Sequence, residues 1–116
     1  MRTYSTSSDT TAYLKDESVD IESADSSAVD PIIEAASSIY ERFGKRVIVT
    51  SAADGNHMRD SKHYSGEALD IRGSKAWGYS GRILRQIVTH LREQLGDDFD
   101  VVRESTHLHI ERDPSD

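Results

Sequence analysis

Residues 61–72 read SKHYSGEALDIR, and this stretch contains the most informative pattern of the sequence. Polar and apolar residues alternate over 67–72, which predicts a β-strand. Gly66 supplies a tight turn before the strand, because glycine adopts positive φ without steric cost. His63 lies late in the preceding loop, seven residues ahead of Asp70 in the strand. A histidine and an aspartate placed in this way are candidates for a shared metal ion.

A second histidine motif, His-Leu-His at 107–109, lies near the C-terminus. On a strand, both imidazoles point to one face and Leu108 points into the core. Ala68 and Asp70 also share a face, and the small alanine would leave space beside the carboxylate for a cation and substrate. Two histidine nitrogens and one carboxylate oxygen are the protein ligands of many catalytic zinc sites, which keep a fourth position for water. We therefore predict a zinc ion on His63, Asp70 and one histidine of 107–109.

Glu104 is the candidate general base, and its position depends on the turn that follows it. If Ser105–Thr106 is a two-residue hairpin loop, Glu104 lies opposite His107 and diagonal to His109, on one face. That arrangement suits a carboxylate that takes a proton from water. If one strand instead runs unbroken over 99–111, Glu104 lies on the opposite face. Ser-Thr is not a preferred hairpin turn, so a wider loop is a third alternative.

Composition narrows the class of protein. The formal net charge of -7 argues against a nucleic-acid binder, because no basic stripe neutralises phosphates. The absence of cysteine excludes disulfides and thiolate metal sites, so a metal must use histidine and carboxylate. No apolar run approaches a membrane span. Residues 1–11 lack the apolar stretch of a signal peptide, so we expect synthesis in the cytosol and no membrane partner. His57, in a polar loop, and His90, on a helix, are expected to be solvated or structural.

The predicted elements give an α+β fold in which a small antiparallel sheet has its helices packed on one side. Helical spacing of apolar residues predicts one helix that begins at Asp30–Pro31 and stops at Gly44. A second helix is expected between a Ser80 cap and Gly96. Short strands are expected at 47–50, 67–72, 99–103 and 107–111.

The length of 116 residues fits one domain with a single core. Residues 1–28 are rich in Ser, Thr, Asp and Glu, and we expect a polar N-terminal arm that is disordered or loosely docked. Within this arm, 13–14 and 19–21 could form a short strand. Residues 29–116 are expected to form the metal-binding domain, acting as a monomer.

Five positions, Ser61, His63, Gly66, Ala68 and Asp70, match the Ser-x-His-x-x-Gly-x-Ala-x-Asp signature of a known family. The chain thus resembles the zinc D-Ala-D-Ala carboxypeptidases and their relatives. These relatives include L-alanyl-D-glutamate endolysins of phages and the metal-binding domain of hedgehog proteins. The resemblance extends over roughly residues 29–112. It implies a small hedgehog/DD-peptidase-like α+β domain, a zinc ion, and hydrolysis of peptide bonds in cell-wall peptidoglycan. A role in lysis would place its action at the cell wall.

Carried over by position, the resemblance makes His63 and Asp70 the first two zinc ligands. In members that close on His-x-His the second histidine is the third ligand, which is His109 here. Members with Glu-x-x-His would instead select His107. We take His109 as the ligand and His107 as a neighbouring group that stabilises the oxyanion or holds substrate. Glu104 is the base in both arrangements.

The chain departs from the family at the arginine that binds a substrate's terminal carboxylate in many members. The corresponding stretch, 51–54, reads Ser-Ala-Ala-Asp, and Arg59 lies further along the loop. The departure weakens the expectation of a free D-Ala-D-Ala terminus as substrate more than that of an L-alanyl-D-glutamate bond. Two other classes remain open: a zinc-stabilised binding module without catalysis, and an acidic interaction domain without metal.

Overall fold

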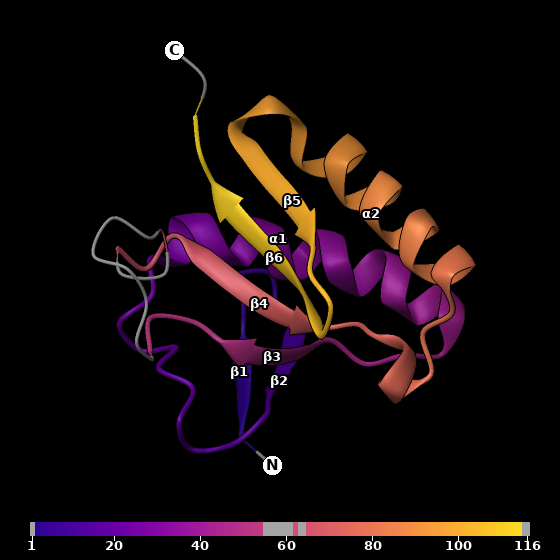
Figure 1. The fold of residues 1–116 in the computed structure, drawn as a ribbon. Coiled ribbons are helices and arrows are strands. Elements are labelled where there is room, and N and C mark those ends of the chain that lie inside the picture. Colours follow the sequence, from indigo (N-terminus) through magenta and orange to yellow (C-terminus); the bar gives the residue numbers. More distant parts are fainter. Residues whose placement is uncertain (1, 55–61, 63–64, 115–116) are drawn as a thin grey trace.

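One six-stranded sheet, with two helices packed against one of its faces, makes up the fold (Figure 1). The computed structural model describes residues 2–54, 62 and 65–114. In chain order the elements are β1 (Thr3–Ser5), β2 (Thr11–Leu14), α1 (Ser26–Tyr40), η1 (Glu41–Phe43), β3 (Ile48–Ser51), β4 (Ala68–Arg72), η2 (Lys75–Trp77), α2 (Gly81–Leu95), η3 (Gly96–Asp98), β5 (Phe99–Arg103) and β6 (His107–Arg112), where η marks a short 3₁₀ helix. The expected α+β class, with both helices on one side, is confirmed.

The sheet is mixed, whereas an antiparallel sheet was expected. Its strand order is β1-β2-β3-β4-β6-β5, in which β2 and β3 run parallel and every other pair is antiparallel. The parallel pair follows from the path of the chain, which leaves β2, passes through α1 and returns as β3. Such a crossover through a helix is the usual connection between parallel strands.

The second helix begins and ends where the sequence predicts. The Ser80 hydroxyl accepts a hydrogen bond from the Ile83 N–H at 3.2 Å and caps the first turn. Gly96 follows the last residue with a φ of 73°, in the left-handed region that favours glycine. The buried side of α2 carries aliphatic residues at intervals of three and four: Leu84, Ile87, Val88 and Leu91.

The first helix begins five residues earlier than the expected start at Pro31, so that boundary was wrong. Asp25 is the N-cap, and its carboxylate accepts from the Ser27 N–H at 3.0 Å. Asp30, the expected cap, instead accepts a hydrogen bond from the Tyr4 hydroxyl at 2.5 Å. Arg112 holds the true cap from outside the helix, with 2.8 Å between its guanidinium and Asp25. A contact from the far end of the chain therefore helps to decide where α1 begins.

Most of the segment expected as a disordered or loosely docked arm, residues 1–28, belongs to the domain. Its first 14 residues contain β1 and β2, and β2 pairs with β3 in the register Leu14 with Val49. Leu14 is 1% exposed, and Val19 and Ile21 further along are also buried in the core. Four-residue strands carry too little periodicity to be distinguished from a polar arm.

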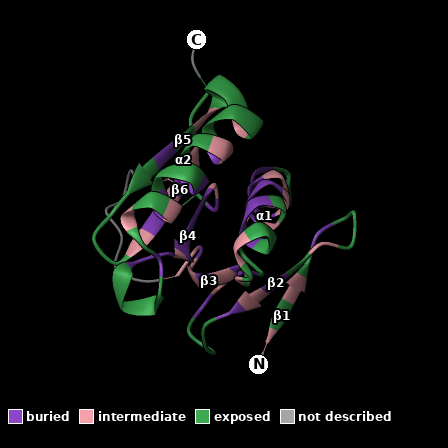
Figure 2. Ribbon diagram, turned by 90° about the vertical axis from the view of Figure 1, so that its right-hand side faces the viewer, coloured by how far each residue is buried: buried purple, intermediate pink, exposed green. Residues whose placement is uncertain are grey.

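The core lies between the helices and one face of the sheet, and the other face is free of helices (Figures 1 and 2). Inward residues from five of the six strands are fully or almost fully buried: Leu14, Val49, Leu69, Ile71, Val101, Leu108 and Ile110. The residues between them point to the helix-free side, which we call the open face. Among the described residues, neither helix combines the length and apolar composition needed to cross a membrane.

Candidate active site

Adjacent strands β4 and β6 place Asp70 and both late histidines on the open face. The antiparallel register pairs Asp70 with His109 and Arg72 with His107. The intervening pairs, such as Ile71 with Leu108, point into the core. The alternation predicted from the sequence therefore brings together side chains from distant parts of the chain.

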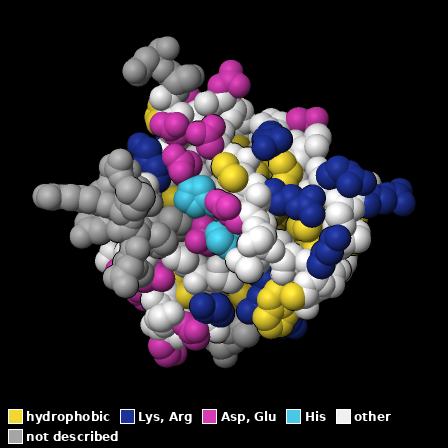
Figure 3. Space-filling model, viewed as in Figure 1, with side chains coloured by type: hydrophobic (Ala, Val, Ile, Leu, Met, Phe, Trp, Pro, Cys, Tyr) yellow, Lys and Arg dark blue, Asp and Glu magenta, His cyan; other side chains and the backbone are white. Residues whose placement is uncertain are grey.

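Asp70 is the centre of this arrangement. It is only 8% exposed, which is unusual for a carboxylate without compensating partners. Its Oδ1 lies 3.0 Å from Nδ1 of His109, and its Oδ2 lies 3.5 Å from Nε2 of His107. In Figure 3, histidine and acidic side chains meet in the middle of this face. The close approach of carboxylate and imidazoles is the arrangement that a His/Asp metal site requires.

His109 lies between two carboxylates. Its Nδ1 faces Asp70, and its Nε2 lies 2.7 Å from Oε1 of Glu111. The hydrogen bond to Asp70 is the main cause that raises the pKa of His109 to about 9, and Glu111 adds to it against the opposing effect of burial. Without a metal, the ring is thus an imidazolium that donates to both acids. With a metal in place of the Nδ1 proton, Glu111 would hold the other ring nitrogen, as carboxylates commonly do behind histidine ligands.

His107 has a different environment from His109. Its Nδ1 lies 2.9 Å from the Thr106 hydroxyl, and its side chain is 29% exposed compared with 17% for His109. Within the described part of the chain, Asp70 and these two histidines do not form a group whose ligand atoms all lie within 4.8 Å of one another. The two imidazoles therefore do not both close on one point beside the carboxylate. This geometry favours one of them, rather than both, as a ligand.

Of the three arrangements that the sequence leaves open around Glu104, the structure has the two-residue hairpin. The Glu104 N–H donates to the His107 carbonyl at 2.9 Å, and Arg103 pairs with Leu108. Ser105–Thr106 is thus the two-residue connection, and Glu104 shares the face of His107. Its side chain is exposed, and among the described residues its carboxylate has no hydrogen bond or ion pair with Asp70 or the histidines. Its role as base stays a prediction.

The remaining predicted ligand, His63, lies outside the described residues, as do Ser61, His57 and Arg59. Gly66, which is described, has the expected positive φ of 75°. A Cβ there would lie 2.8 Å from the Ser23 carbonyl oxygen, so the turn also requires glycine for close packing.

The structure has an open hollow on one side of Asp70. Ala68 was expected to leave open space beside Asp70, but Ala68 is fully buried. The open space lies on the other side, where a hollow of about 480 Å³ is lined by Asp70, Arg72 and His107, among others. The space beside the carboxylate is therefore reached from the Arg72 side.

Asp54 lies at another wall of this hollow, in the stretch where the family has its arginine. Burial opposes its ionisation, but hydrogen bonds from the backbone N–H groups of Ala52 and Asp20 outweigh burial and lower the pKa of Asp54. These bonds are 2.8 and 2.9 Å long. Asp54 thus fixes the end of β3 to the segment before α1, and it brings no positive charge to the site.

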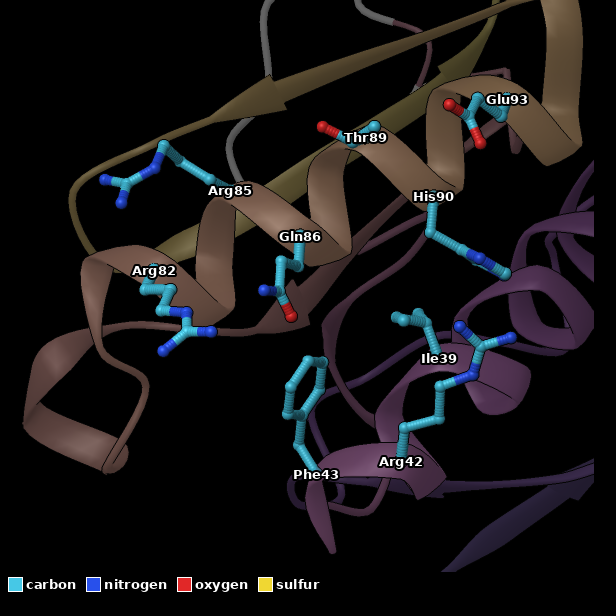
Figure 4. Close-up of a pocket in the computed structure, with 9 residues that line it drawn as sticks. All are labelled: Ile39, Arg42, Phe43, Arg82, Arg85, Gln86, Thr89, His90 and Glu93. Carbon is cyan, nitrogen blue, oxygen red and sulfur yellow. The ribbon is translucent and has the colours of Figure 1, made fainter.

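Two other features of the described residues, an acidic cluster and a hollow between the helices, share single elements of this site. Asp100, Glu111 and Asp113 bring carboxylate oxygens within 4.8 Å of one another, and a hydrogen bond with Asp113 raises the pKa of Asp100. A hollow of about 640 Å³ lies between α1, η1 and α2 (Figure 4). It contains arginines and His90, whose Nε2 lies 2.9 Å from the Ser38 hydroxyl. Among the described residues, neither feature places one carboxylate against two imidazoles, as Asp70 is placed against His107 and His109.

Comparison of the chain with protein-family models, with curated proteins and with solved structures found no match. The family resemblance therefore depends on the residues of the signature.

Two residues of the open face were not predicted as functional, Glu111 and Arg72. Both follow from the period of two, since Glu111 comes two residues after His109 and Arg72 two after Asp70. The alternation that located the histidines could also have located them.

Proposed function

We propose that this chain is a zinc-dependent peptidase that hydrolyses peptide bonds in bacterial cell-wall peptides. The observation that carries the proposal is the meeting of Asp70 and His109, which are 39 positions apart in sequence, at 3.0 Å on an open face. A hollow adjoins Asp70, and Glu111 lies behind His109. This donor set fits zinc, with Asp70 and His109 as ligands and His63 as the third. The family resemblance supplies the substrate class.

The residues then have separate tasks. A bound zinc ion would polarise the scissile carbonyl and lower the pKa of water beside it. Glu104 accepts a proton from the attacking water, and the C–O bond forms. An N–H of His107 donates to the developing oxyanion. Glu104 then gives the proton to the leaving amine as the C–N bond breaks, which yields a carboxylate and an amine.

Metal content tests the ligand assignment directly. Untagged protein should contain about one zinc ion per chain by elemental analysis, and Asp70→Asn and His109→Gln should each lose it. His90→Gln is the matched control, because His90 lies on α2 and bonds Ser38 instead. If His107→Gln loses zinc while His109→Gln retains it, the other histidine register is correct. If no divalent ion binds the wild-type chain, the proposal is wrong.

Glu104→Ala separates chemistry from metal binding. We expect this variant to retain zinc and to lose hydrolysis of purified peptidoglycan, measured as new amino termini identified by mass. Glu93→Ala on α2 is the control, since Glu93 lies in the hollow between the helices. Full activity in Glu104→Ala would exclude Glu104 as the base.

A second candidate function is a zinc-stabilised binding module. The exposed position of Glu104 favours it, because among the described residues the carboxylate has no hydrogen bond or ion pair with the other site residues. In that case zinc mainly adds folding free energy. Zinc binding without any release of amino termini would select this function.

A further inference from the structure

The hollow beside Asp70 runs across several strands of the open face. Its described lining extends from Lys15 after β2, over Thr50 of β3, to His107 of β6. Neighbouring strands lie about 4.8 Å apart, so three steps span about 14 Å. That length accommodates roughly four residues of an extended peptide. A hollow of about 480 Å³ that crosses these strands can accept a short extended peptide, and we call it the trough.

Arg72 occupies the part of this trough nearest to the candidate site. It lies opposite His107 in the strand register, two residues beyond Asp70. Its guanidinium carbon is 3.7 Å from the centre of the Trp77 ring, so the side chain is stacked on the indole. Stacking fixes the guanidinium plane and leaves the N–H donors at its edge for a planar anion. The pair has the form of a prepared carboxylate-binding group.

Arg72 differs in its partners from three other cations of the chain. Arg2 and Arg112 both form ion pairs with carboxylates, at 2.8 Å in each case. Lys15, at the far end of the trough, lies 3.8 Å from Asp16. Within residues 2–54, 62 and 65–114, no carboxylate pairs with Arg72. Trp77, which holds it, is 55% exposed. A charged donor and a large apolar ring thus face the trough together.

We propose that Arg72, held on Trp77, binds the α-carboxylate of the residue whose amine is released by hydrolysis. This inference rests on the proposed peptidase function. Residues two apart on a strand are separated by about 6.6 Å, so a carboxylate on Arg72 places the reacting carbonyl beside Asp70 within one to two residues. The two substrate bonds that the family resemblance suggests, D-Ala-D-Ala and L-alanyl-D-glutamate, both have a leaving residue with a free α-carboxylate. The leaving D-Ala of a D-Ala-D-Ala terminus has a free α-carboxylate, and so does a D-Glu that is linked onward through its γ-carboxyl.

The structure thereby supplies a cation that the family position, at 51–54, lacks. It comes from β4 rather than from the loop after β3. Both substrate types remain open to this chain, and a substrate whose leaving residue is amidated is disfavoured.

Fluorescence of Trp77 provides a test that is independent of catalysis, because it is the single tryptophan of the chain. The probes are acetyl-L-Lys-D-Ala-D-Ala and acetyl-L-Ala-D-Glu linked through its γ-carboxyl to L-Lys. Each is compared with the same peptide carrying an amide in place of that α-carboxylate. We expect the acids to change the fluorescence, and the amides to bind roughly 10- to 100-fold more weakly, as for loss of a charged hydrogen-bonded pair. The two acids distinguish the two sources of the carboxylate.

Arg72→Gln should remove the preference for acid over amide, while Arg82→Gln, an exposed arginine of the other hollow, should retain it. Thermal melting checks that both variants fold. If one variant does not fold, the comparison of acid and amide peptides on the wild-type chain still tests the inference. Equal binding of acids and amides, or no binding of any acid, overturns the inference. Acid-specific binding without hydrolysis sustains the carboxylate-binding role of Arg72 and contradicts the peptidase function. Hydrolysis that is unaffected by amidation of the substrate and by Arg72→Gln sustains the peptidase function and overturns the role of Arg72.

Discussion

At the scale of single residues, the buried Asp70 carboxylate determines the behaviour of its surroundings. A carboxylate that is 8% exposed requires a positive partner, and in the metal-free chain the His109 imidazolium provides it. A histidine ligand must be neutral, so a metal ion would take the place of the Nδ1 proton. The same pair of residues forms an ion pair without metal and, under the proposed function, would supply two ligands to a bound ion.

The raised pKa of His109 predicts a pH-dependent stability of the metal-free chain. The folded-state pKa of about 9 lies above the ordinary value of 6.5, so the stabilisation is fully present below pH 6.5 and is lost as pH rises through 9. The free energy of unfolding in urea, measured in chelator, should therefore fall between pH 6.5 and 9. His109→Gln should lack this part of the decline. An equal decline in both proteins would contradict the imidazolium assignment.

At the scale of elements, alternation along strands and caps at helix ends account for most of what the sequence predicts. The α2 helix has a serine before it, a glycine after it and a single apolar stripe, so its bounds follow from local signals. For the connection between β5 and β6 the sequence left three arrangements open, and the hydrogen bond between Glu104 and His107 selects the two-residue hairpin. The start of α1 does not follow from local signals, because its cap is held by Arg112 from β6.

The cap of α2 gives a prediction at this scale. Ser80→Ala removes the acceptor for the Ile83 N–H and should lower the free energy of unfolding by about 1 kcal/mol, measured by urea denaturation. Ser80→Asp restores an acceptor and should keep most of the stability. A loss as large in Ser80→Asp as in Ser80→Ala would show that the hydroxyl does not act as a cap.

At the scale of the whole molecule, the N-terminal strands complete the core. Leu14 is 1% exposed and lies in the same cluster as the helix residues. Removing its side chain leaves a cavity that the rigid sheet fills only in part.

We therefore expect Leu14→Ala to lower the free energy of unfolding by about 2–5 kcal/mol, measured by chemical denaturation. Thr11→Ala on the same strand is the matched control, because Thr11 is exposed, and it should change stability by roughly 0.5 kcal/mol or less. A small effect of Leu14→Ala would mean that residues 1–28 are only loosely docked after all.

The sequence by itself determined the local features: α2 and its caps, the strands β3 to β6, the turn at Gly66, and the shared face of His107 and His109. These depend on periodicity and on backbone preferences, which act between residues close together in the chain. Tertiary structure decided that β2 joins the sheet in parallel, that α1 begins at Ser26, and that open space lies beside Arg72 rather than Ala68. Such outcomes depend on which distant groups meet, and neither the 3.0 Å contact of Asp70 with His109 nor the stacking of Arg72 on Trp77 has a local signal in the chain.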